Sequence, residues 1–213
     1  MRVLRLLLIA ALIVWAFATL GFVRWIRERY GRGGPIPVSQ AGMLLSPLRR
    51  FIDPVGATMQ RFRIERGDTV LELGPGPGYF TAGAAEAVGP GGRLLCLDLQ
   101  VGMLRLLQER LDGQRVDNAC PVAADACRLP LPDASVDAAF LITVLGEIPD
   151  RVTALHELRR VLKPGGVLSF RETLGDPDYV FEATLRDLCR ACGFEPLSHD
   201  RLPLGYAMSF TRP

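Results

Sequence analysis

The stretch from Val70 to Thr81, VLELGPGPGYFT, constrains the fold more than any other part of the chain. An apolar run typical of a buried strand leads into Gly74, Gly76 and Gly78, and a helical pattern follows. Glycines let the backbone turn sharply and approach a ligand closely, and a helix N-terminus points its amide groups at that ligand. In a doubly wound sheet, such a turn lies at the carboxyl edge of the first strand, where ligands bind. The stretch therefore predicts an α/β domain with a ligand site at that edge.

Strand and helix patterns alternate from Arg66 onward. Strands are expected over residues 69–73, 93–98, 120–123, 136–142 and 166–171, and helices over 79–88, 101–111, 151–162 and 178–192. This rhythm predicts a mostly parallel sheet that is covered on both faces. Two further short strands, 195–199 and 206–211, are close enough in sequence to pair as a C-terminal antiparallel hairpin.

Acidic residues stand at the carboxyl ends of the first three expected strands. Glu72 interrupts an otherwise apolar strand, and its ionised carboxylate needs a polar partner, which a ligand amine would provide. Asp98 ends the second strand, where it could accept hydrogen bonds from ribose hydroxyls, and Asp125 follows the third, where it could accept from an exocyclic amine. Each acid alone is equally well explained as a helix cap or a solvated charge. Three of them at successive strand ends favour a ligand site.

The spacing of the glycines distinguishes this loop from a dinucleotide-binding loop. A dinucleotide-binding loop has the pattern G-x-G-x-x-G, whereas the third glycine here comes one position early. The early glycine and Glu72 both disfavour an NAD(P)-dependent oxidoreductase, which is kept as an alternative.

Together these residues resemble the class I S-adenosylmethionine-dependent methyltransferases. Residues 129–141 (LPLPDASVDAAFL) and 155–166 (LHELRRVLKPGG) also look like segments of that family. The resemblance covers about residues 64–213 and is nearest to the small-molecule branch that includes quinone-biosynthesis methyltransferases. It implies a Rossmann-like fold, methyltransferase activity and S-adenosyl-L-methionine as the cofactor. It also implies the cofactor-binding residues, namely Glu72 at the methionine amino group, Asp98 at the ribose, Asp125 at the adenine amine, Leu99 against the adenine ring, and Gly74, Gly76 and Gly78 at the backbone approach.

The sequence departs from this family after the fourth expected strand. Many relatives carry a histidine there, whereas this chain has LGEI over residues 145–148. Glu147 could be a base, an acceptor anchor or a surface acid before Pro149, and we favour the surface acid. Glu172 and Tyr206 are further acceptor-side candidates without supporting spacing. Methyl transfer chiefly requires alignment in a dry pocket, so the lack of an obvious base does not exclude catalysis.

Residues 1–30 are expected to form a membrane anchor. The run from Leu6 to Val23 contains 18 residues without a charge, which as a helix would span about 27 Å, close to the thickness of a bilayer core. Four arginines follow it and two precede it, which places the following domain in the cytoplasm. The rival interpretation is a signal peptide cleaved after Ala16-Phe17-Ala18, but the apolar run continues past that site, so we favour a retained anchor.

Residues 31–63 should connect this anchor to a methyltransferase domain at 64–213. A Gly/Pro-rich linker occupies residues 31–37, and residues 38–63 have the pattern of short amphipathic helices broken at Pro47 and Pro54. These helices could cover one face of the domain or lie on the membrane surface as part of an acceptor-binding lid.

Charge and cysteines exclude several other classes. The formal net charge is +2, but residues 33–213 carry −3, which argues against nucleic acid as a partner. Five cysteines are an odd number and favour a reducing compartment over a disulfide framework. Cys189 and Cys192 could form half of a zinc or redox site, but they fall in a helical pattern that indicates core packing, and no metal is expected.

The sequence therefore predicts a membrane-anchored S-adenosylmethionine-dependent methyltransferase that acts on a small, lipophilic acceptor. A non-catalytic cofactor-binding membrane protein is the second hypothesis. The sequence leaves the acceptor atom and the oligomeric state open.

Overall fold

The computed structural model of the protein describes residues 34–47 and 49–213. The predicted anchor, Leu6–Val23, lies outside the described residues. Within the described part of the chain, no helix is both long enough and apolar enough to cross a membrane.

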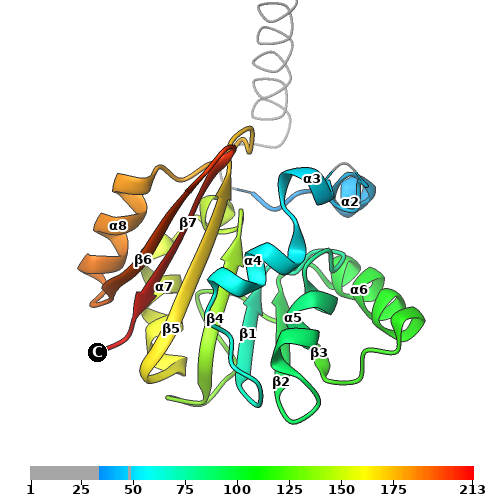
Figure 1. Cartoon of the computed structure of the whole chain (residues 1–213), viewed down its shortest axis with the longest axis horizontal. Coiled ribbons are helices and arrows are strands. Elements are labelled where there is room, and N and C mark those ends of the chain that lie inside the picture. The colour runs from blue at the N-terminus through cyan, green and yellow to red at the C-terminus, as the bar shows by residue number, and fades with distance from the viewer. Residues whose placement is uncertain (1–33, 48) are drawn as a thin grey trace, which may run out of the picture.

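A seven-stranded sheet in the order β3-β2-β1-β4-β5-β7-β6 forms the centre of the domain (Figure 1). Its strands are β1 (Thr69–Leu73), β2 (Arg93–Asp98), β3 (Ala119–Ala123), β4 (Val136–Ile142), β5 (Leu162–Thr173), β6 (Glu195–Leu202) and β7 (Gly205–Thr211). The first five are parallel, and β7 runs antiparallel to both β5 and β6. The predicted α/β class and C-terminal hairpin are confirmed, because the chain has this Rossmann-like, mostly parallel sheet.

Helices cover both faces of the sheet. They are α5 (Thr81–Val88), α6 (Val101–Gln114), α7 (Arg151–Val161) and α8 (Glu182–Ala191). Residues on β1 alternate between two hydrophobic cores, since successive side chains of a strand point to opposite faces. Val70 belongs to the core that α5 and α6 close, whereas Leu71 and Leu73 belong to the core that α7 and α8 close. Glu72 shares the face of Val70 and so points toward the side of α5 and α6.

The expected elements agree with the observed ones apart from their ends. Strand β5 begins four residues earlier than expected, at Leu162, and α8 begins at Glu182 rather than at residue 178. The helix starts late because residues 174–181 form a loop whose Val180 is held on both sides. The amide of Val180 donates to Glu172 at 3.3 Å, and its carbonyl accepts from the Tyr206 hydroxyl at 2.6 Å.

The segment before the sheet forms short helices, and Pro47 and Pro54 interrupt it as expected. They are η1 (Val38–Gln40), α2 (Ala41–Leu44), α3 (Arg49–Ile52) and α4 (Val55–Arg61). Helix α4 belongs to the domain core, since Met59 is buried and the ring of Phe62 lies 5.3 Å from that of Phe140 on β4. The earlier part, residues 34–53, is called the cover segment below. It crosses the carboxyl edge of the sheet, where the Gln100 side chain donates to the Ile36 carbonyl at 2.9 Å.

The two cysteines of the CxxC pattern are packed in the core. Cys189 and Cys192 are both buried on the side of α7 and α8, with free thiols. Their burial matches the packing interpretation.

Candidate cofactor and acceptor site

A cavity of about 440 Å³ opens at the carboxyl edge of the parallel strands. Its walls are the glycine loop after β1, the ends of β2, β3 and β4, and the cover segment. Among the residues predicted from sequence, those that line it are Glu72, Gly74, Gly76, Asp98, Leu99, Asp125 and Glu147. The strand ends therefore bring together residues that are up to 75 positions apart in the chain, from Glu72 to Glu147.

The three glycines have different roles, although all three have positive φ angles. A Cβ atom on Gly74 would lie 2.5 Å from a methyl carbon of Val144, and one on Gly78 would lie 2.4 Å from a methyl carbon of Leu107. These two positions therefore need glycine because the protein packs tightly against them. A Cβ on Gly76 would have only Leu44 nearby, at 3.5 Å. Gly76 is thus the glycine that leaves room for a ligand, and Gly78 does not line the cavity.

Asp98 connects the glycine loop to the end of β2. One carboxylate oxygen accepts from the amide of Gly76 at 3.1 Å, and the other accepts from the amide of Gln100 at 2.8 Å. Burial raises the pKa of the carboxyl, against these two hydrogen bonds. A carboxylate can accept about four hydrogen bonds, so Asp98 keeps acceptor capacity for ligand hydroxyls.

Glu72 is the most deeply buried acid of the cavity. It is 3% exposed, and among the described residues no cation forms an ion pair with it. Its side-chain partners are uncharged: the hydroxyl of Thr81 and the thiol of Cys96, the latter at 3.8 Å. Burial raises the pKa of Glu72 to about 7. An ionised carboxylate in such a place costs free energy unless a cation joins it, so the site fits a ligand that carries an amine.

Asp125 and Leu99 complete the predicted set at the outer part of the cavity. Asp125 is exposed and accepts the amide of Cys127 at 2.8 Å, which fixes its carboxylate at the end of β3. Leu99 is an exposed apolar side chain at the end of β2. A buried acid, a second acid with spare acceptor capacity and an exposed apolar side chain in one cavity fit the amino acid, ribose and adenine parts of S-adenosylmethionine.

Glu147 is not the surface acid that we favoured from sequence. It follows β4 in the short helix η2 (Leu145–Glu147) and lines the cavity. Burial raises its pKa to about 8, together with the negative charges of Asp176, Asp178 and Asp98. From sequence, Pro149 suggested that Glu147 lies in a surface turn. In the structure the cover segment crosses this turn, and the backbone amide of Ile36 donates a hydrogen bond to the Glu147 carboxylate.

Arg49, Tyr79 and Thr143 are among the cavity residues that the sequence did not single out. The Arg49 guanidinium lies 4.9 Å from the ring centre of Tyr79 and donates to the Leu44 carbonyl at 3.2 Å. Thr143 directly follows β4 and has a φ of +54°, a strained conformation for a β-branched residue, and its amide donates to the Arg171 carbonyl at 2.9 Å. The adjacent arginines at 49 and 50 could have identified Arg49 as a candidate, whereas no local sequence pattern marks Thr143 as a cavity residue.

Glu172 and Tyr206, the other acceptor-side candidates, do not line the cavity. Both are almost fully buried, and both hold Val180 in the loop before α8. Their position indicates a structural role.

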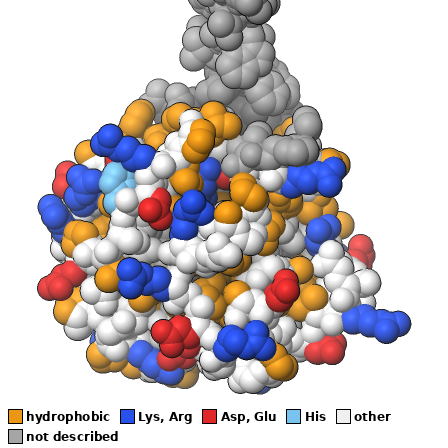
Figure 2. Space-filling model, in the orientation of Figure 1, with side chains coloured by type: hydrophobic (Ala, Val, Ile, Leu, Met, Phe, Trp, Pro, Cys, Tyr) orange, Lys and Arg blue, Asp and Glu red, His pale blue; other side chains and the backbone are white. Residues whose placement is uncertain are grey.

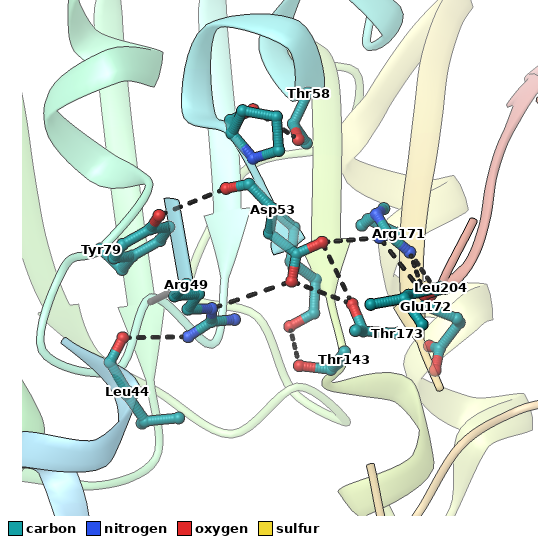
Figure 3. A network of polar contacts seen from close by, with 12 residues as sticks. Leu44, Arg49, Asp53, Thr58, Tyr79, Thr143, Arg171, Glu172, Thr173 and Leu204 are labelled. Atoms are coloured by element: carbon teal, nitrogen blue, oxygen red, sulfur yellow. Dashed lines mark hydrogen bonds and ion pairs between the residues drawn. The ribbon is translucent and has the colours of Figure 1, made fainter. Parts of the chain in front are cut away.

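A buried ion pair joins the cover segment to β5 (Figure 3). Asp53 follows α3, and its carboxylate lies 2.6 Å from the Arg171 guanidinium, with both side chains 3% exposed. The same carboxylate accepts from the Thr173 hydroxyl at 3.1 Å and lies 3.9 Å from Arg49. Arg49 lines the cavity, so the ion pair between Asp53 and Arg171 holds the part of the cavity wall that contains Arg49 against β5.

Comparison with known proteins agrees with this geometry. Residues 71–170, just under half of the chain, match the family model described as "Methyltransferase domain". The chain is 34% identical to a demethylmenaquinone methyltransferase of Geobacillus stearothermophilus over 115 residues, which are 54% of this chain and 49% of the relative. It is 38% identical to a ubiquinone/menaquinone biosynthesis C-methyltransferase of Pasteurella multocida over 118 residues, 54% of this chain and 44% of the relative. The chain thus spans about half the length of the curated relatives it matches.

Solved structures show the fold. A SAM-dependent methyltransferase from Aquifex aeolicus superposes with a TM-score of 0.78 and 20% identity, over 84% of this chain and all of that one. The [4+2]-cyclase SpnF superposes with a TM-score of 0.66 and 18% identity, over 75% and 79%. The second likeness shows that this fold also supports other chemistry, so the reaction must be argued from the site. Residues 71–170 are thus similar in sequence to a methyltransferase domain, and the chain shares its fold with these solved structures.

Proposed function

We propose that this chain is an S-adenosylmethionine-dependent methyltransferase that a membrane anchor holds beside its acceptor. The observation that carries the proposal is that one cavity contains both Glu72, a buried carboxylate with no cation partner among the described residues, and the open backbone at Gly76. The match of residues 71–170 to a methyltransferase domain supports it.

The chain's own residues account for cofactor binding. Glu72 would pair with the methionine amino group, and Asp98 would accept hydrogen bonds from the ribose hydroxyls while it holds the glycine loop in place. Leu99 would lie against the adenine ring, and Asp125 would accept from the adenine amine. When bound, S-adenosylmethionine supplies a methyl group on a positively charged sulfur, and the sulfur keeps the bonding electrons when the methyl leaves. The task of the protein is therefore to align the acceptor and to exclude water.

The acceptor side of the cavity favours a lipophilic molecule. Aromatic and aliphatic side chains line it, including Tyr79, Phe140, Ile142, Val144 and Ile148. The relatives named above are described as a demethylmenaquinone methyltransferase and a ubiquinone/menaquinone biosynthesis C-methyltransferase, so a quinone-like ring is the first acceptor to test. Arg49, the cation of this wall, could hold an acceptor oxygen, and Glu147 could take the proton that the acceptor loses.

The membrane part of the proposal depends on the sequence of residues 6–23. We propose that this run is retained as an anchor and that the domain lies in the cytoplasm, where S-adenosylmethionine is made. A carbonate wash of membranes tests retention, and N-terminal sequencing of the mature protein tests processing. Release of the protein by carbonate, or a mature chain that begins at Thr19, would refute anchoring without touching the enzymatic proposal.

Turnover is tested with radiolabelled methyl groups. The full chain in vesicles receives S-adenosylmethionine labelled in its methyl group and a reduced demethylated quinone, and label is counted in the organic extract. The proposal expects label in the extract with wild-type protein and none with Asp98→Ala. S-adenosylhomocysteine binding without transfer to any acceptor in a total lipid extract would favour the non-catalytic alternative. NAD binding in its place would favour the oxidoreductase.

A further inference from the structure

Large exposed apolar side chains gather at one edge of the domain. Nine are exposed among the described residues, and eight of them lie in the cover segment or in segments next to the carboxyl ends of the parallel strands. These eight are Val38, Met43, Leu99, Val101, Val152, Leu174, Phe181 and Leu204. The ninth, Leu197, lies on β6 near the opposite edge, where its neighbour Pro196 pairs with Phe210. Figure 2 shows a group of hydrophobic side chains at the top of the molecule, which is this edge, and others scattered over the rest of that face.

The opposite edge has a different surface. Its loops expose charged residues such as Glu65, Arg66, Arg115 and Asp117, and they expose no large apolar side chain among the described residues. Single exposed apolar residues are ordinary on soluble proteins, but an uneven concentration on one face marks a contact surface.

Three members of the group lie in the loop after β5 and in the neighbouring turn: Leu174 begins that loop, Phe181 ends it before α8, and Leu204 lies between β6 and β7. Leu174, Phe181 and Leu204 are 53%, 70% and 43% exposed. The Leu174 amide donates to the Leu204 carbonyl at 3.1 Å, which joins the loop after β5 to the turn between β6 and β7. The Arg171 guanidinium also donates to the Leu204 carbonyl, at 3.4 Å. These three residues are called the apolar tip below.

The described chain begins at this same edge. Ile36 is bonded to Gln100 at the mouth of the cavity, and Gly34 is two residues before it. Ten residues, 24–33, separate Gly34 from the apolar run that ends at Val23. A chain of that length can span at most about 35 Å. If Leu6–Val23 crosses a bilayer, the cavity edge is therefore confined near the lipid surface.

We propose that the carboxyl edge of the domain docks on the lipid bilayer, with the apolar tip inserted at the interface. This inference rests on the anchoring stated under the proposed function and deepens it, because docking would turn the cavity mouth toward a membrane-borne acceptor. Apolar contact rather than charge drives the docking, since residues 33–213 carry a formal charge of −3. Uncharged phosphatidylcholine vesicles are therefore the appropriate probe.

Fluorescence quenching by brominated lipid tests the insertion in the full chain. The chain contains two tryptophans, Trp15 and Trp25, which are first changed to phenylalanine. Phe181→Trp then reports on the apolar tip, and Leu197→Trp is the matched control on an exposed apolar position away from the edge. Both proteins are reconstituted into phosphatidylcholine vesicles with and without bromine on the acyl chains.

Docking predicts about a twofold or greater loss of fluorescence for Phe181→Trp in brominated vesicles and little loss for Leu197→Trp, because interfacial apolar groups reach the upper acyl chains. Equal quenching of the two variants, or none in Phe181→Trp, would overturn the proposal. A dimer in sedimentation that shields Phe181→Trp would instead identify the edge as a self-association surface and would also overturn it. S-adenosylhomocysteine binding, measured on the same samples, separates a failure of docking from a failure of the proposed function.

Discussion

Replacing Asp53 with asparagine should strongly destabilise the protein. The substitution keeps the shape of the side chain but leaves the Arg171 guanidinium without its carboxylate, at a position where both side chains are 3% exposed. Removing one partner of a buried ion pair costs about 3–5 kcal/mol, because the remaining charge is buried without compensation. For a domain of this size, each kcal/mol lowers Tm by about 2–4 °C, so we expect a fall of roughly 6–20 °C.

The assay is thermal unfolding of the full chain followed by circular dichroism at pH 7. Asp133→Asn is the matched control, since its carboxylate lies 2.7 Å from Arg160 but is 78% exposed. An exposed pair is worth about 1 kcal/mol or less, so this variant should stay close to wild type. Asp53→Leu combined with Arg171→Met should recover part of the loss, because it removes both charges. If Asp53→Asn lowers Tm no more than Asp133→Asn does, the buried pair does not stabilise the cover segment as argued.

Three further predictions concern the cavity and the buried acids. Gly76→Val should abolish S-adenosylhomocysteine binding in calorimetry, because its side chain would occupy the ligand's space; unchanged affinity would show that the ligand lies elsewhere. Glu147→Gln should remove a limb near pH 8 from the pH profile of kcat, and an identical profile in both proteins would exclude Glu147 as the proton acceptor. The ligand-free protein should lose stability from about pH 5 to 8, because the raised pKa values of Glu72, Glu147 and Glu172 keep protons on the folded state that the unfolded state has released. A Tm that rises over this range would contradict those assignments.

The parallel sheet could be predicted from sequence because each strand carries its own local signal. Buried strands such as residues 69–73 and 136–142 are mostly apolar runs, each with one acid, and turns rich in glycine or proline separate them from helices. The acids at the strand ends were also visible, because Glu72 is out of place in an apolar strand. Because the carboxyl ends of parallel strands meet at one edge of the sheet, the strand assignments alone predict that these acids come together there.

Contacts between distant segments could not be predicted in the same way. Asp53 and Arg171 are 118 positions apart, and neither position has a pattern that marks a buried pair. The same holds for Glu147, whose burial depends on the cover segment crossing above it. Gly78 looked like a ligand contact because its spacing matches that of Gly74 and Gly76, whereas its actual neighbour is Leu107 on α6. In each case the deciding contact is tertiary.

Calorimetric titration of S-adenosylhomocysteine into the full chain in detergent tests the central claim most directly. The account predicts binding at micromolar concentration, no heat from NAD, and a loss of more than about tenfold in affinity in Asp98→Ala, because one carboxylate bonded to two hydroxyls contributes roughly 1.5–3 kcal/mol per hydrogen bond. Circular dichroism of Asp98→Ala confirms that the variant is folded. No binding by the wild-type protein, or equal affinity in the folded Asp98→Ala variant, would contradict the claim that this cavity holds the cofactor.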